Sequence, residues 1–227
     1  MFISCPINKR KDYCLDEYFS RVVNYNWIDK EYFFCDNSYD KRYRLGLMDR
    51  YGFEIDYVDP REKSNVMYMC LSMNRCLDKF LKSDCDFWFI NECDVMCDAD
   101  VIESLYANNK MICGTSYFIG NGHDNKLCEV AFERSFGDNT NRNITTIEGY
   151  KKFDGKLQQV DSVGFGAVLV HRTVLENYRF RVDSSHPKDH CDTFFYIDMY
   201  ERGMKIFRDN SIIAEHKNQS WQIVTDR

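Results

Sequence analysis

The sequence predicts an α/β domain built on a mostly parallel central sheet with helices on its faces. Short apolar runs typical of buried strands alternate with longer segments whose apolar residues recur at helical spacing. Strands that alternate with helices in this way pair in parallel through right-handed crossovers. The chain has 227 residues, enough for one sizeable α/β domain with a complete core.

The elements of the first half have recognisable ends. Residues 2–6 form an apolar run that stops at a proline, and Gly52 follows a helical pattern as a stop signal. The expected strands are 2–6, 32–38, 53–60, 86–90 and 110–118, and the expected helices are 14–27, 41–52, 65–83 and 98–109.

The second half begins with a polar, loop-like stretch over 117–159, which predicts irregular excursions or a hairpin. Strand character then returns, and Gly203 ends a helix. The expected elements are a strand within 158–172, helices over 173–178 and 191–203, and two short strands over 204–209 and 211–216.

Composition restricts the classes of function. The formal charge of −6 disfavours wholesale binding to nucleic acid or to an anionic membrane. No apolar run approaches the roughly 18–20 residues of a membrane span, and the N-terminus lacks the layout of a signal peptide. We therefore expect a cytoplasmic protein whose 11 cysteines are small core hydrophobes.

Polar residues gather at the predicted strand ends. In a parallel sheet, ligands sit beyond the carboxyl ends of the strands, so these residues form one candidate site. No glycine-rich loop follows the first strand, which argues against a standard dinucleotide or P-loop fold. The strand-end residues are Pro6, Asn8, Asp36, Asn37, Asp59, Glu92 and Asp94.

The stretch "FINECDVMCD" places Glu92 and Asp94 directly after an apolar strand. Carboxylates there can hold Mg²⁺ or Mn²⁺ together with a substrate diphosphate. The plainer alternative is a polar turn that caps the next helix. A zinc site through Cys93 and Cys97 lacks the usual ligand spacing.

Three further residues each have two interpretations. Asn74 falls on the apolar stripe of its helix, so it is either a satisfied helix asparagine or a functional residue. His216, at a strand end, is either structural or a metal ligand. Asp192 opens a helix, where it can be a cap, a general base, or both, with the helix N-terminus expected to lower its pKa.

Five stretches, in order, resemble segments of a known enzyme family. "FISCPINKR" and "YFFCDNSYD" are similar to its opening strand and to its second strand with a "DNSTD"-type turn. "MNRCLDKFLKSDCDFWFINECDV" is similar to "ARNxGLxxAxGxYxxFLDxDV", and "VDSVGFGAVLVHRTVLE" to the acceptor side of the cleft. "CDTFFYIDMYERGMKIFRDNSIIAEHK" is similar to "EDxxFCxRxxxxGxKIxxDxxxxxxH". The chain thus resembles the GT-A-fold glycosyltransferases, family 2-like group, nearly end to end.

The resemblance implies a single GT-A domain over residues 1–227, with a small second sheet near the acceptor site. Residues 1–116 would form the nucleotide-sugar-binding half and 117–227 the acceptor and catalytic half. The implied activity is metal-dependent, inverting transfer from a UDP- or GDP-sugar to a hydroxyl acceptor. The acceptor is not identified: a glycan, a lipid-linked glycan, a protein and a modified nucleic-acid base all remain open.

The same resemblance implies roles for individual residues. Asp192 would be the catalytic base, while Asp94 and His216, with Glu92, would hold Mn²⁺ or Mg²⁺. The residues expected to contact the donor are Pro6, Asn8, Asp36, Asn37, Asp59, Asn74, Arg75 and Glu92.

The chain departs from the family pattern at two positions. Glu92 stands where the family's DXD motif has a shorter acid, so Asp94 is the safer metal ligand. Cys191 replaces the first acid of the family's "ED" pair, which leaves Asp192 as the local base. A sugar-phosphate nucleotidyltransferase or a non-catalytic nucleotide-binding module on a similar sheet is the alternative.

Overall fold

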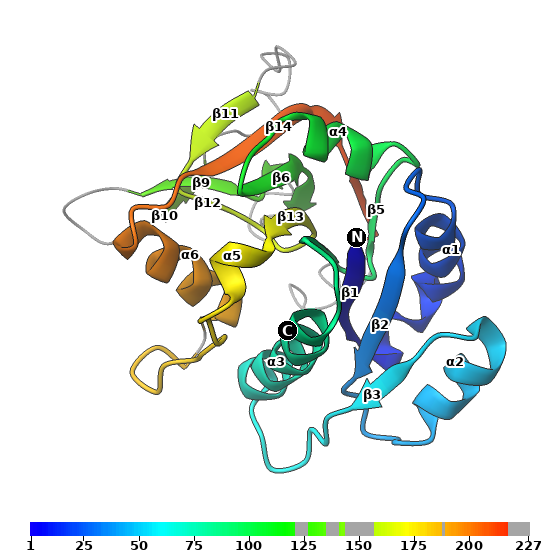
Figure 1. Cartoon of the computed structure of the whole chain (residues 1–227). Helices are drawn as coiled ribbons and strands as arrows, with labels where there is room; N and C mark the ends of the chain where they lie inside the picture. The colour runs from blue at the N-terminus through cyan, green and yellow to red at the C-terminus, as the bar shows by residue number, and fades with distance from the viewer. Residues whose placement is uncertain (121–126, 135–140, 144–156, 188, 218–227) are drawn as a thin grey trace.

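The structure is a computed structural model that describes residues 1–120, 127–134, 141–143, 157–187 and 189–217. It confirms the predicted fold class: a large mixed sheet with helices on both faces and small additional sheets (Figure 1). Strands from both halves of the chain share the large sheet. In spatial order its strands are β11 (Leu157–Val160), β14 (Ile206–Ile213), β6 (Ile112–Ser116), β13 (Ala167–His171), β4 (Phe87–Asn91), β1 (Phe2–Ile7), β2 (Glu31–Asp36) and β3 (Ile55–Tyr57).

The helices form two layers because alternate strand residues point to opposite faces of the sheet. In β1, Phe2 packs into one core and Ile3 into the other; Trp88 and Phe89 divide in the same way in β4. Helices α3 (Asn65–Lys82), α5 (Arg172–Leu175) and α6 (Cys191–Glu201) cover the face of Phe2 and Trp88. Helices α1 (Asp12–Val23), α2 (Tyr43–Tyr51) and α4 (Val101–Ala107) cover the other.

The predicted helix signals are present. Ser64 caps α3 by accepting a hydrogen bond from the backbone N–H of Met67 at 3.3 Å. Gly52 ends α2 in the left-handed conformation, and Gly203 has a positive φ just after α6. None of the helices described is long and apolar enough to cross a membrane, and the expected compartment stays a prediction.

The last two strands do not divide where we expected: the expected strand over 211–216 belongs partly to β14 and partly to β15 (Glu215–His216). Strand β14 runs without a break from Ile206 to Ile213. The "DNS" stretch at the expected break is a bulge against β6, in which the Asp209 carboxylate accepts hydrogen bonds from the N–H and hydroxyl of Ser211. Asp209 also accepts from Asn108 at 2.6 Å, so tertiary partners keep these polar residues inside the sheet.

The strand expected within 158–172 is divided into β11, β12 (Ser162–Val163) and β13. The loops expected within 117–159 fall partly outside the described residues. The small sheets pair β10 (Asn141–Asn143), β9 (Ala131–Arg134) and β12; β7 (Phe118–Gly120) and β8 (Leu127–Glu129); and β5 (Val95–Met96) and β15 (Glu215–His216).

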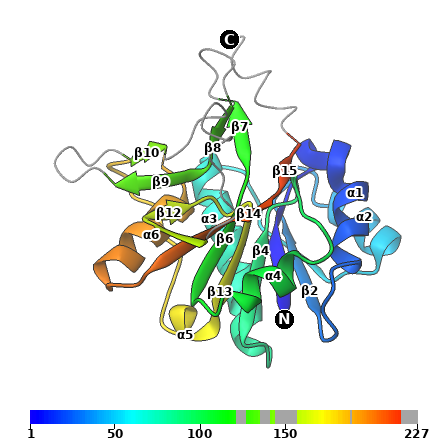
Figure 2. The same ribbon diagram turned by 90° about the horizontal axis from the view of Figure 1, so that it is seen from above.

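The topology brings distant segments to one edge of the sheet. Strands β1, β2 and β4 are parallel, so their carboxyl ends meet there. Strand β13 is antiparallel to β4, so the chain before it, at Gly166, starts from the same edge. Strand β15 pairs with β5 just beyond β4 and brings the end of the described chain to the same place (Figure 2).

Candidate active-site cleft

A cleft of about 330 Å³ opens at this edge of the sheet. We call it the central cleft. Seven predicted site residues line it, drawn from both halves of the sequence. They are Pro6, Asn8, Asn37, Glu92, Asp94, Asp192 and His216.

Asp94 is the most enclosed carboxylate of the central cleft, with a side chain 6% exposed. It follows β4, and its backbone oxygen accepts a hydrogen bond from Lys217 N–H at 2.7 Å. Its Oδ2 atom forms an ion pair with the ammonium group of Lys11 and lies 3.4 Å from Nε2 of His216. Asp94 is therefore held between a cation and an imidazole.

His216 is buried beside Asp94 on β15. Burial lowers its pKa, and the nearby ammonium of Lys11 lowers it further, while Asp94 acts in the opposite direction. Its ring stacks on Tyr117 with centroids 5.7 Å apart. Its Nδ1 atom has no hydrogen-bond partner among the described residues. The lowered pKa favours the neutral imidazole at pH 7, and a neutral ring can offer one of its nitrogen atoms to a metal ion.

Glu92 is half-buried in the central cleft, and its side chain faces like charges. Desolvation, with the carboxylates of Asp94 and Asp192, raises its pKa to about 8. Its backbone is fixed by a 2.9 Å hydrogen bond from its N–H to the carbonyl of Gly166. At neutral pH Glu92 is mostly a protonated acid, which can donate a hydrogen bond but is a poor metal ligand.

The donor set fits a divalent cation only in part. No group of three His, Cys, Asp or Glu side chains gathers for a metal anywhere in the described ranges. A carboxylate oxygen and an imidazole nitrogen 3.4 Å apart can nevertheless both reach one ion at about 2.0–2.3 Å. Asp94 and His216 fit a two-residue site whose other ligands would come from a diphosphate and water.

The end of the central cleft near β2 is lined by two amides. Asn8 donates through Nδ2 to Oδ1 of Asn37 at 2.7 Å, and Asn37 donates to the hydroxyl of Ser72. Asp36 is buried behind this pair and does not line the cleft; its carboxylate accepts from both the N–H and the hydroxyl of Ser38. Burial raises the pKa of Asp36.

Besides Asp36, three predicted donor residues lie outside the lining of the central cleft. Asp59 is paired with Arg61, which lowers its pKa, and Arg75 lies 3.8 Å from the carboxylate of Asp56 on the surface. Asn74 exchanges two hydrogen bonds with the backbone of Phe180, at 2.9 and 3.0 Å. Asn74 therefore has the geometry of the satisfied helix asparagine.

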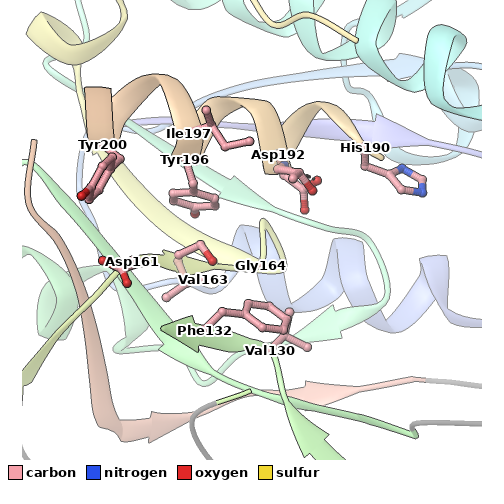
Figure 3. A pocket seen from close by; sticks show the side chains of 12 residues that line it. Val130, Phe132, Asp161, Val163, Gly164, His190, Asp192, Tyr196, Ile197 and Tyr200 are labelled. Carbon is pink, nitrogen blue, oxygen red and sulfur yellow. Dashed lines mark hydrogen bonds between the residues drawn. The ribbon is translucent and has the colours of Figure 1, made fainter. Parts of the chain in front are cut away.

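Asp192 lies between the central cleft and a second pocket of about 230 Å³, which we call the side pocket. Figure 3 shows α6 along one wall, with the carboxylate of Asp192 pointing across to β9 and β12. The aromatic side chains Phe132, Tyr196 and Tyr200 line the pocket, together with the polar residues Asp161 and Ser162.

Burial reverses the expected lowering of the pKa of Asp192, although the helix end itself acts in the expected direction. Asp192 accepts a hydrogen bond from Thr193 N–H at 2.8 Å, which favours its ionised form. Desolvation outweighs the charge of His190 and the backbone hydrogen bonds, so the pKa of Asp192 is raised. A raised pKa makes the carboxylate a stronger base once it is ionised.

Sequence reasoning missed several lining residues. Lys11 lies in the basic run after the first strand, but the sequence gives no sign that it pairs with Asp94. Tyr117 fits because Gly164 and Gly166 lack side chains: a Cβ on Gly166 would lie 2.6 Å from its ring. Met69 and Met73 of α3 also line the cleft, although nothing in the sequence distinguishes them from core residues. The cysteines of the opening stretch, Cys93 and Cys97, are buried free thiols.

Comparisons with known proteins bear on the fold. No model of a known protein family matches the chain, and no curated protein matches it. Among solved structures, a mycobacterial protein superimposes with a TM-score of 0.60 at 12% identity, covering 98% of this chain and 69% of that one. TarS residues 1–349 from S. aureus, crystallised in complex with UDP, gives 0.57 at 10% identity, covering 94% and 60%.

The fold is GT-A-like. A longer structure of TarS gives a TM-score of 0.58 at 9% identity, and this chain spans 36% of its length. At such identities the likeness shows a glycosyltransferase-like fold and nothing of the activity.

Proposed function

We propose that the chain is a glycosyltransferase that binds a nucleoside-diphosphate sugar in the central cleft. The observation that carries the proposal is the convergence of Glu92, Asp94, Asp192 and His216 on one cleft at the carboxyl edge of a GT-A-like sheet. Acids gathered at such an edge are costly to desolvate unless they serve a ligand.

The donor would lie along the cleft from β2 to α6. The amides of Asn8 and Asn37 would face the base, and the diphosphate would lie near Asp94. UDP is the first nucleotide to test because TarS was crystallised with it. Glu92, protonated at neutral pH, would donate a hydrogen bond to the donor.

Asp94 and His216 would hold Mn²⁺ or Mg²⁺. Such an ion would neutralise charge on the departing diphosphate. The protein's contribution is to present one carboxylate oxygen and one neutral imidazole side by side. Lys11 adds a second positive charge within the same cleft.

Asp192 would be the catalytic base. It borders both the central cleft and the side pocket, so an acceptor hydroxyl entering from the side pocket would meet it next to the donor. The acceptor oxygen bonds to the anomeric carbon, the bond from that carbon to the diphosphate oxygen breaks, and the hydroxyl proton passes to Asp192. One displacement of this kind inverts the anomeric centre. The acceptor class, whether glycan, lipid-linked glycan, protein or modified base, stays open.

Replacing Asp192 by Asn tests the proposal. The amide keeps the size of the side chain but cannot take a proton, so turnover should fall by about 100-fold or more. Turnover is measured with a panel of UDP- and GDP-sugars in the presence of Mn²⁺, from the nucleoside diphosphate that is released. The affinity of Asp192→Asn for UDP, measured by calorimetry, should differ little from that of the wild type. Unchanged turnover would remove Asp192 as the base.

The same measurements separate the alternatives. Release of inorganic pyrophosphate from a nucleoside triphosphate and a sugar phosphate would indicate a nucleotidyltransferase. Binding of UDP or GDP without any transfer or hydrolysis would indicate a non-catalytic module. Absence of nucleotide binding by the wild-type protein would contradict the proposed function altogether.

A further inference from the structure

The contact between Lys11 and Asp94 joins segments 83 residues apart in the sequence. Lys11 ends the 3₁₀ turn Lys9–Lys11 after β1, and its side chain is 25% exposed. Its ammonium group lies on Oδ2 of Asp94, the same oxygen that faces His216. The place where a divalent cation would bind is thus already in contact with a positive charge.

An ammonium group and a divalent cation cannot share this oxygen at low cost, because like charges at contact distance repel strongly in a partly buried cleft. Binding a metal to Asp94 and His216 therefore requires Lys11 to leave. Once displaced from Asp94, Lys11 would need another anionic partner, and a diphosphate bound in the cleft would supply anionic oxygens.

We propose that Lys11 is a diphosphate-binding residue that neutralises Asp94 in the donor-free cleft and transfers to the donor diphosphate when a cation binds Asp94. The proposal rests on the proposed function and deepens it. Lys11 thereby keeps metal affinity low until the nucleotide is present, so that metal and nucleotide bind cooperatively.

The backbone around Lys11 suits this role because it is anchored while the side chain is long and flexible. The N–H of Lys11 donates to the carbonyl of Asn8 at 2.8 Å, and the side chain of Asn8 is tied to Asn37. Lys11 therefore starts from a fixed point on the wall of the cleft, between Asn37 and Asp94. A lysine side chain offers three rotatable donors on a four-carbon stem, which allows exchange between two anionic partners.

A purely structural ion pair would behave differently. If Lys11 served only to compensate the buried charge of Asp94, its removal would destabilise the fold and leave the site no better for metal. If Lys11 competes with the metal, its removal exposes Asp94 to the metal and strengthens metal binding. The two roles predict opposite signs for metal affinity.

The test compares Lys11→Met with the wild type in two measurements. Without nucleotide, Lys11→Met should bind Mn²⁺ about tenfold more tightly than the wild type. The electron paramagnetic resonance signal of free Mn²⁺ measures this affinity. UDP binding at saturating Mn²⁺, measured by calorimetry, should weaken by about tenfold, since the diphosphate loses a charged partner. Unchanged or weaker Mn²⁺ binding by Lys11→Met would overturn the proposal.

Two control variants sharpen the result. Lys9 carries an equal charge two residues away, but its ammonium group lies 5.7 Å from the centre of the Tyr43 ring, and Lys9 is not among the residues that line the cleft. Lys9→Met should therefore change neither affinity by more than about twofold. Lys11→Arg keeps the charge and should keep Mn²⁺ affinity within about threefold of the wild type. An equal effect of Lys9→Met would assign the change to net charge and overturn the role of Lys11.

The wild-type protein gives an independent measurement if Lys11→Met does not fold. Saturating UDP should raise the affinity of the wild type for Mn²⁺ by about tenfold or more, and independent binding of the two ligands would overturn the proposal. Failure of the wild type to bind any nucleotide would instead reject the proposed function. The Mn²⁺ measurement on the nucleotide-free protein remains a separate test of competition between Lys11 and the metal.

Discussion

At the scale of single residues, the central cleft is defined by carboxyl groups in different states of charge. Asp94 is paired with Lys11, whereas burial, with the carboxylates of Asp94 and Asp192, raises the pKa of Glu92 to about 8. Two acids one residue apart thus differ in their partners: Asp94 is ion-paired with Lys11, and Glu92 is mostly a protonated acid at pH 7. The pattern Glu-x-Asp in the sequence gave the position of both but not this difference, because Lys11 comes from a distant segment.

Glu92→Gln should remove part of the pH dependence of stability. The folded protein binds the Glu92 proton more tightly than the unfolded chain, whose ordinary pKa is 4.5, so this group's stabilising contribution is present below pH 4.5 and is lost as pH rises through about 8. Glutamine cannot ionise. At pH 9 the variant should therefore be more stable than the wild type by about 1–3 kcal/mol.

Urea unfolding of both proteins at pH 5, 7 and 9 measures this difference. The free energies of unfolding should lie close together at pH 5 and separate as the pH rises. Curves that run parallel from pH 5 to pH 9 would contradict the assigned proton on Glu92.

At the scale of elements, the sequence predicted where the first strands lie because apolar periodicity is a local signal, although β3 ends at Tyr57, before the proline expected to stop it. It predicted partners poorly. Asn74 on α3 meets Phe180, which is 106 residues away, so its satisfied state cannot be read from helical spacing. The break expected near residue 210 is instead a bulge inside β14, where the Asp209 carboxylate accepts a hydrogen bond from Asn108, 101 residues away.

Gly166→Ala should disturb the cleft through Tyr117. The new Cβ would lie 2.6 Å from the Tyr117 ring and 2.9 Å from Val95, so the ring must shift and its stacking on His216 is disturbed. We expect a loss of about 1–3 kcal/mol in stability from the overpacking, together with weaker binding of Mn²⁺ in the presence of UDP. Thermal unfolding and calorimetry measure the two effects.

Gly46→Ala is the matched control for this substitution. No atom lies within 4 Å of the Cβ that alanine would add there, and Gly46 is inside α2. Alanine at that position should stabilise the helix by up to about 1 kcal/mol and leave Mn²⁺ binding unchanged. Similar losses in both variants would show that contact with Tyr117 is not the cause.

At the scale of the whole molecule, the central cleft joins early and late segments of the described chain, from Pro6 to His216. Its walls come from β1, β4 and the start of α6, and β15 adds His216. A ligand that bridges these segments binds only the folded protein, so it must raise the apparent stability of the entire fold by mass action. When UDP and Mn²⁺ are each present at about 100 times their dissociation constants, the free energy of unfolding should rise by about 2.7 kcal/mol or more.

For a chain of this size, that gain should raise the midpoint of thermal unfolding by about 5–10 °C. Asp94→Asn should keep the fold but lose most of the increase that depends on Mn²⁺, because the amide removes the charge that attracts the ion. The part of the increase that UDP gives without metal should remain, since Lys11 no longer pairs with Asp94 and is free to meet the diphosphate. A full Mn²⁺-dependent increase in Asp94→Asn would place the metal elsewhere.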